Sequence, residues 1–87
     1  MARGEVVFVS PNGGMIVVGH DHGFTVVEML GDEGELERGD VVFGDWQATG
    51  REPIRKSGES QALDAYFQGL WGDLNSAVTI ARNTGGG

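Results

Sequence analysis

Residues 4–28 read GEVVFVSPNGGMIVVGHDHGFTVVE, and this stretch decides the fold. Three apolar runs alternate with two turn sequences, at residues 11–14 and 20–23. The runs are rich in valine and phenylalanine, which favour strands. The turns contain Asn-Gly and Gly, which supply the positive φ that tight turns need. The stretch therefore predicts an antiparallel meander with strands at 4–10, 15–19 and 24–30.

The first two of these strands have no polar residue to face water. Residues 6–9 (VVFV) and 15–18 (MIVV) are continuously apolar. A strand with one wet face alternates apolar and polar side chains instead. Such runs indicate either strands covered on both faces or an exposed apolar patch.

Residues 31–72 contain the signals expected to complete a barrel. The acidic segment 31–38 (GDEGELER) predicts an exposed loop, and residues 41–47 predict a strand. Residues 51–56 predict a short edge strand, because Pro53 cannot donate to a central ladder. Residues 61–68 (QALDAYFQ) fit either a strand or a helix, and the alternation of apolar and polar residues favours a strand.

The C-terminal part predicts a short helix over residues 73–83. Asp73 is a suitable N-cap. Leu74, Ala77, Val78 and Ala81 would share one face of this helix. Residues 84–87 (TGGG) are expected to be a flexible tail.

Together these elements predict an all-β fold, a small five-stranded OB-like barrel over residues 1–72 with the helix packed on or beside it. The chain has 87 residues, which is enough for one domain. Its 16 glycines suit a fold of short strands and many turns.

Composition narrows the classes of function. The net charge is −7, which opposes general nucleic-acid binding because phosphates attract basic side chains. The absence of cysteine fits a reducing compartment, so a cytoplasmic location is expected. No apolar run reaches the roughly 18 residues of a membrane span, so no membrane partner is expected.

Residues 4–11 (GEVVFVSP) resemble the opening strand of the bacterial cold-shock domain. Residues 12–18 are similar to its Gly-led second strand, and residues 36–43 (LERGDVVF) to its entry into the fourth strand. The resemblance covers about residues 4–47. It implies an OB barrel that binds single-stranded nucleic acid by stacking bases on exposed aromatic side chains.

The chain departs from that family at most stacking positions. Phe8 keeps an aromatic side chain there, whereas the other positions hold Met15, Val17, Thr25, Val27 and Glu28. Each base–aromatic stack contributes about 1–3 kcal/mol, so the substitutions remove most of that binding energy. The resemblance therefore supports the fold more strongly than the ligand.

Two groups of residues are candidate binding sites. The first is the barrel face formed by Phe8, Met15, Val17 and Val27. The second is Arg51, Arg55 and Lys56, half of the six basic residues, which could contact phosphates or an acidic partner. Basic residues on an edge strand also serve to prevent aggregation. The aromatic residues Phe8, Trp46, Tyr66 and Trp71 could form a stacking platform or fill the core.

Nothing in the sequence predicts catalysis, a cofactor or a metal. His20 and His22 flank Asp21 in a turn, but no further histidine or cysteine is present to complete a transition-metal site. We therefore expect a non-enzymatic binding module, either for single-stranded nucleic acid or, through its aliphatic face, for a protein partner. A monomer or a weak homodimer is expected.

Overall fold

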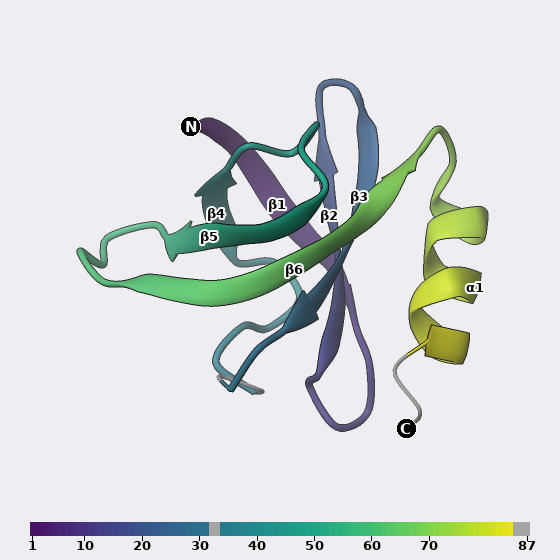
Figure 1. The fold of residues 1–87 in the computed structure, drawn as a ribbon, viewed down its shortest axis with the longest axis horizontal. Coiled ribbons are helices and arrows are strands. Elements are labelled where there is room, and N and C mark those ends of the chain that lie inside the picture. The colour runs from purple at the N-terminus through teal and green to yellow at the C-terminus, as the bar shows by residue number, and fades with distance from the viewer. Residues whose placement is uncertain (32–33, 85–87) are drawn as a thin grey trace.

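The computed structural model describes residues 1–31 and 34–84, which form six strands and one helix (Figure 1). The elements are β1 (Ala2–Val9), β2 (Met15–His20), β3 (Gly23–Met29), β4 (Val41–Gly44), β5 (Gly50–Lys56), β6 (Ala62–Trp71) and α1 (Leu74–Thr84). The strands close into an antiparallel barrel in the order β1-β2-β3-β6-β5-β4, and β4 pairs back with β1.

The predicted all-β barrel with a C-terminal helix is confirmed, although the expected count of five strands is one too few. Of the ambiguous residues 61–68, all but Gln61 belong to a strand, β6, which runs on to Trp71. β5 is not an edge strand, because it lies between β4 and β6. It pairs with β4 only at Val42↔Lys56 and Phe43↔Arg55, so Pro53 lies beyond that short ladder and blocks no pairing there.

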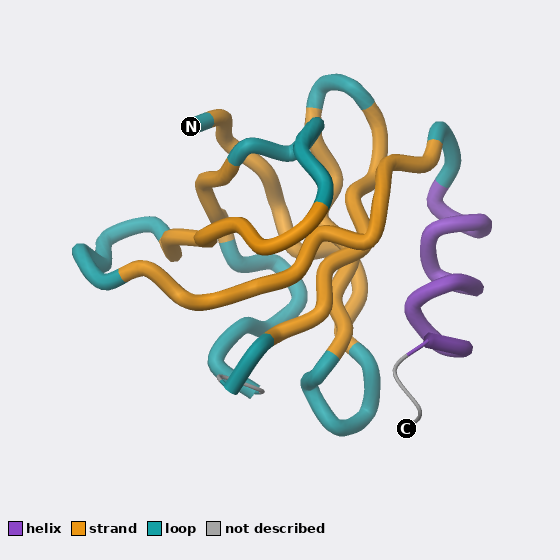
Figure 2. Tube along the Cα trace, viewed as in Figure 1, coloured by secondary structure: helices purple, strands orange, loops and turns teal. Residues whose placement is uncertain are grey.

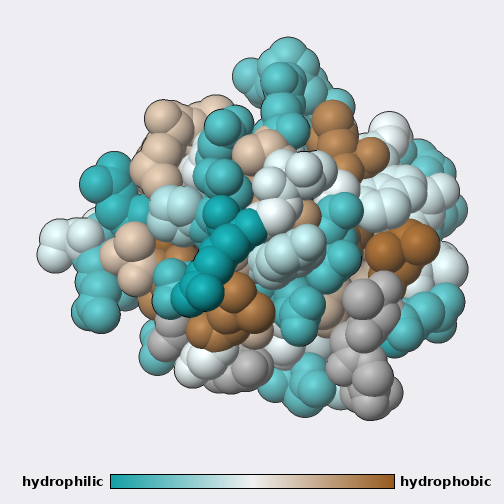
Figure 3. Space-filling view, in the orientation of Figure 1, coloured by the Kyte–Doolittle hydropathy of each residue, from teal (hydrophilic) through white to brown (hydrophobic). Residues whose placement is uncertain are grey.

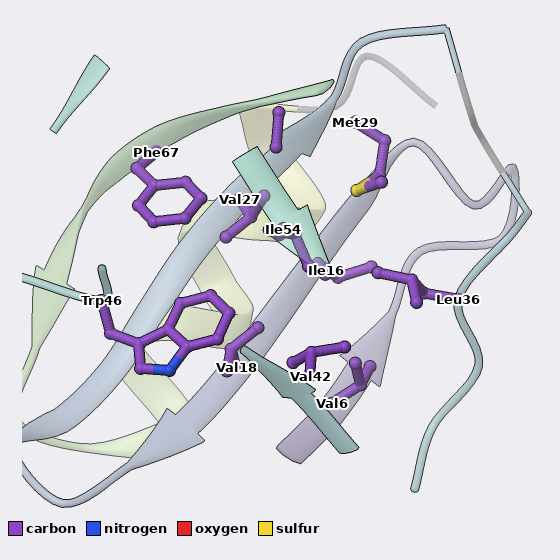
Figure 4. Close-up of a cluster of buried hydrophobic side chains, with 11 residues drawn as sticks. Val6, Ile16, Val18, Val27, Met29, Leu36, Val42, Trp46, Ile54 and Phe67 are labelled. Carbon is purple, nitrogen blue, oxygen red and sulfur yellow. The ribbon is translucent and has the colours of Figure 1, made fainter. Parts of the chain in front are cut away.

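The interior of the barrel is filled by side chains from all six strands and from both connecting loops that flank β4. Figure 4 shows Trp46 and Phe67 at one end of this core and Met29 and Leu36 at the other. The buried members are Val6, Ile16, Val18, Val27, Met29, Leu36, Val42, Trp46, Ile54, Ala65 and Phe67. Leu36 is thus the apolar anchor of the acidic loop.

Trp46 closes one end of the barrel, and two glycines make room for it. Its ring stacks on Phe67 at 5.5 Å between centroids, and its Nε1 donates to the carbonyl of Ala2 at 2.8 Å. A Cβ on Gly44 would lie 2.9 Å from Trp46 Cη2. A Cβ on Gly4 would lie 3.0 Å from Trp46 Nε1 and 2.5 Å from Val18 Cγ1. Both positions therefore require glycine for packing reasons.

A second core lies outside the barrel, between the sheet and α1. Met15, Val17 and Val26 point away from the barrel interior and pack against Ala77 and Ala81 of the helix. Figure 2 shows α1 alongside the strands rather than across the end of the barrel. The apolar run 15–18 is therefore covered on both faces, which is one of the two alternatives its pattern allowed.

The helix begins as the sequence indicates. Asp73 accepts hydrogen bonds from the backbone N–H and the hydroxyl of Ser76, at 3.4 and 3.1 Å. Of the expected apolar face, Ala77, Val78 and Ala81 pack on the sheet, but Leu74 is 40% exposed. The last three residues of the expected tail, 85–87, lie outside the described residues.

We predict that Gly44→Ala destabilises the barrel by about 1–3 kcal/mol, because the new methyl group would overlap the Trp46 ring. Gly19→Ala is the matched control. Its Cβ would meet side chains only at 3.4 Å, an ordinary contact, so the free energy of unfolding should change by less than about 0.5 kcal/mol. Urea denaturation measures both, and equal losses would contradict the role of Gly44.

We predict that Ala77→Asp lowers the free energy of unfolding by about 2–4 kcal/mol, because a carboxylate would enter the apolar layer under α1. Asn75→Asp places the same charge on the exposed first turn, where the helix dipole favours it. That variant should be as stable as the parent in the same denaturation experiment. A tolerated Ala77→Asp would mean that the helix does not dock as described.

Candidate functional site

The predicted binding face of Phe8, Met15, Val17 and Val27 does not form one exposed surface in the structure. Met15 and Val17 are buried beneath α1. Val27 pairs with Ile16 and points into the barrel, on the opposite side of the sheet. The prediction of one exposed face through these residues is therefore wrong, because alternation sends Val27 inward and α1 covers the outward residues.

Phe8 lies at the border of this covered region. A bulge between Val6 and Phe8 shifts the register of β1 against β2. As a result, Val7 and Phe8 both pack against the outer core, while Val6 and Val9 pack inside. Phe8 is half-buried, and the guanidinium of Arg82 lies 5.5 Å from its ring centroid. Its ring is thus already engaged by the helix.

The three predicted basic residues, Arg51, Arg55 and Lys56, differ in exposure and in ion pairing. Lys56 is half-buried and pairs with Asp40 at 3.5 Å beside the β4–β5 ladder. Arg51 pairs with Asp64 at 3.4 Å, but the side chains are 71% and 62% exposed, so water screens the pair and either partner exchanges readily. Arg55 is exposed on the outer face of β5. Arg51 and Arg55 are therefore available to a ligand, whereas Lys56 helps to close the barrel.

The structure places Arg3 and Phe43 beside Arg55, and neither is among the site residues predicted from the sequence. Arg3 pairs with Phe43 across β1 and β4, and Phe43 pairs with Arg55 across β4 and β5. The Arg55 guanidinium lies 6.0 Å from the centroid of the Phe43 ring. All three side chains point outward, since their neighbours Gly4, Val42 and Ile54 are buried inside the barrel.

A second cross-strand pair lies further along β5, toward its start, where Arg51 pairs with Tyr66, which is 43% exposed. We call the outward-facing residues of the row and of this pair the basic–aromatic strip, and it consists of Arg3, Phe43, Arg55, Arg51 and Tyr66. Figure 3 shows strongly hydrophilic side chains gathered over β5 and β6 on this face, with smaller apolar areas beside them. The alternation in residues 41–44 could have indicated that Phe43 points outward, but not which residues flank it.

A hollow lies at the barrel end that Trp46 closes. It has a volume of about 410 Å3 and is lined by the start of β1, the β2–β3 turn and the segment after β4. The turn predicted after β2 is present, and Asp21 and His22 are exposed in it. The structure also brings His20, Asp21 and His22 together with Arg3 and Asp45 around one opening. We call this hollow the mouth pocket.

A chain of hydrogen bonds fixes His20 beneath the mouth pocket. The hydroxyl of Thr25 donates to the carbonyl of Trp46 at 2.6 Å, so it must accept from His20 Nε2, which lies 2.8 Å away. The backbone N–H of His22 donates to His20 Nδ1 at 3.3 Å. This network assigns the neutral Nε2–H tautomer, in which both ring nitrogens are used.

Electrostatics favour the same neutral form. Burial lowers the pKa of His20, and the neighbouring His22 lowers it further, against an opposing effect of Asp21. The ring of His20 stacks on Trp46 at 6.1 Å between centroids, with 22° between the planes. His20 is thus held as a neutral, oriented ring over the end of the core.

The remaining findings concern metals, membranes and relatives. Across residues 1–31 and 34–84, no three histidine, cysteine, aspartate or glutamate side chains lie close enough together to hold a metal ion. In the same residues no helix has the length and apolar character needed to cross a bilayer. Comparison with protein-family models, curated proteins and solved structures finds no match to this chain.

We predict that the fold loses stability on mild acidification through His20. Its pKa is lowered in the folded state, so the unfolded chain takes up the proton first as the pH falls below about 6.5. The stability that neutral His20 contributes to the fold is fully present above that pH, and it is lost as the pH falls through the lowered pKa of the folded state. Urea denaturation at about pH 7.5 and about pH 5.5 should show this loss, before most carboxylates titrate.

The variant His20→Gln should flatten this pH dependence, because an amide can replace the donor to Thr25 but does not titrate. His22→Gln leaves His20 buried, and burial is the largest cause of the shift, so it should retain most of the dependence. If both variants kept the parent's pH profile, another group would have to be responsible.

Proposed function

We propose that this chain is a small non-enzymatic module that binds single-stranded nucleic acid on the basic–aromatic strip. The observation that carries the proposal is the adjacency of Arg3, Phe43 and Arg55 on the outer face of three neighbouring strands. Proteins that bind single strands combine stacking aromatic rings with basic side chains that follow the phosphates. Phe43 and Tyr66 would stack bases, and the arginines would meet the backbone.

The charge of the chain sets the expected strength of this binding. Only three arginines belong to the strip, and Asp64 competes for one of them. The net charge of −7 adds a long-range repulsion against phosphates. We therefore expect weak binding that is readily measured only at low salt, where screening and counterion competition are smallest.

The OB class and a cytoplasmic location belong to the same proposal. A small barrel in which β1 pairs with both β2 and β4 supports the OB class, although the usual form has five strands rather than six. The absence of cysteine supports a reducing compartment.

The alternative, a protein interface on the aliphatic face, loses its main support. Met15 and Val17 would have to be uncovered by removal of α1 before a partner could reach them. The large apolar side chains that stay exposed among the described residues, Met1, Tyr66, Leu70 and Leu74, do not reproduce that face. The basic–aromatic strip needs no such rearrangement.

We predict that Phe43→Ala weakens binding of an oligothymidylate of about ten nucleotides by about 1–3 kcal/mol, the value of one base–aromatic stack. Arg55→Ala should also weaken it, and should reduce the slope of log affinity against log salt by about 0.7, the value for one phosphate contact on a single strand. Fluorescence anisotropy at several salt concentrations measures both quantities.

Arg38→Ala is the control, because Arg38 is an exposed basic residue in the loop before β4 and does not belong to the strip. It should change neither the affinity nor the slope by as much. An NMR titration locates the contact, with amide shifts expected on β1, β4, β5 and β6 rather than on α1. No binding at low salt, or equal losses in Arg38→Ala and Arg55→Ala, would refute the proposed function.

A further inference from the structure

The mouth pocket combines a size suited to a small planar ligand with a ring to stack it on. Its volume of about 410 Å3 lies within the usual range of small-molecule pockets, and mouths of β-barrels are common places for them. Both nitrogens of His20 are used in internal hydrogen bonds. The part of His20 left for a ligand is therefore the face of its ring, backed by Trp46.

The rim of the pocket offers unpaired groups of both charges. Arg3, Asp21 and Asp45 all line the hollow and are exposed. The ion pairs of the described residues involve other side chains, so the guanidinium and both carboxylates keep their full capacity to bind a ligand. A ligand that fits would present acceptors to arginine along one edge and donors to a carboxylate along another.

Among the nucleobases, guanine has this pattern. Its O6 and N7 accept a bidentate pair of hydrogen bonds from arginine. Its N1–H and amino group can donate together to one carboxylate. Adenine has no two adjacent acceptors, and thymine has no amino group. Cytosine has adjacent acceptors, O2 and N3, but its single amino group lies beside them on the same edge, so it cannot present two acceptors to arginine and two donors to a carboxylate. We propose that the mouth pocket is a guanine-selective subsite, with the base stacked on His20 between Arg3 and the carboxylates of Asp21 and Asp45.

The position of Arg3 links this subsite to the surface that a strand would follow. Arg3 lines the mouth pocket and also ends the basic–aromatic strip. A strand lying over Phe43 and Arg55 could therefore place its next base in the pocket. As a subsite for a base within a bound strand, the pocket rests on the proposed function. A free guanine nucleotide could form the same contacts in the pocket without it.

The test compares three oligonucleotides of about ten nucleotides, a length that a single barrel can bind. One is an oligothymidylate, and the others replace a central thymine by guanine or by adenine. We expect the guanine oligonucleotide to bind about tenfold more tightly than the other two, which should bind alike. The NMR signals of the His20 ring and of the Trp46 indole N–H should shift with the guanine oligonucleotide and with guanosine monophosphate.

Variants separate the pocket from the strip. Asp45→Asn and Asp21→Asn should reduce the preference for guanine while leaving oligothymidylate binding unchanged or slightly tighter. Glu59→Gln removes an acid from the exposed β5–β6 turn and should preserve the preference. A preference that survives in both aspartate variants would overturn the assignment of the carboxylates to the base.

The failure of the subsite and the failure of the proposed function give different results. If the oligonucleotides bind equally and the His20 and Trp46 signals stay still, the subsite is refuted and the proposed function stands. If no oligonucleotide binds but guanosine monophosphate shifts those signals, the proposed function is refuted and the guanine site stands for a free nucleotide. If neither the oligonucleotides nor guanosine monophosphate bind, both are refuted.

Discussion

The fit of one indole ring into the end of the barrel is the constraint on which the rest of the structure depends. Trp46 follows the short strand β4, and its contacts reach three other strands. Its Nε1 bonds to Ala2 at the start of β1, its carbonyl accepts from Thr25 in β3, and its ring stacks on Phe67 in β6. β4 itself pairs with β5 over only two positions. The contacts of Trp46 therefore supply stability at the end of the barrel where the β4–β5 ladder is short. The same residue supports His20 and forms the base of the mouth pocket.

The two halves of the barrel use their outer faces differently. The meander β1–β2–β3 has apolar residues on both faces, and α1 covers the outer one. The meander β4–β5–β6 carries arginine and aromatic side chains on its outer face, and α1 contacts this meander at β6, where Trp71 packs against the outer core. The helix thus covers the outer face of the first meander, and the arginine-bearing face remains accessible. A division of this kind lets a chain of 87 residues bury two apolar layers without losing a polar surface for recognition.

Local patterns in the sequence were sufficient to predict the first meander and the N-cap Asp73, because each depends on neighbours within a few residues. The alternation in residues 61–68 correctly favoured a strand, but their composition also allowed a helix, and the pairing of β6 with β3 and β5 decides between the two. The candidate site depended even more on distant pairing. Arg51 and Arg55 could be selected from their clustering, but Arg3 and Phe43 join them only through the β1–β4 and β4–β5 ladders. Met15 and Val17 were assigned to a surface because nothing local indicates that residues about 60 positions later return to cover them.

The short ladder between β4 and β5 has a consequence for the motions of the barrel. The hairpin of β5 and β6 is held by an extended ladder, and β6 is joined along much of its length to β3. Separation of β4 from β5 breaks far fewer backbone hydrogen bonds than separation at either of those boundaries. We therefore expect local opening to have its lowest free energy at this seam, so that hydrogen exchange of its amides proceeds through opening of the seam rather than through global unfolding. Arg55 and Phe43 lie on opposite sides of that seam. The surface proposed to bind single-stranded nucleic acid is therefore also the part of the barrel that we expect to open locally most often.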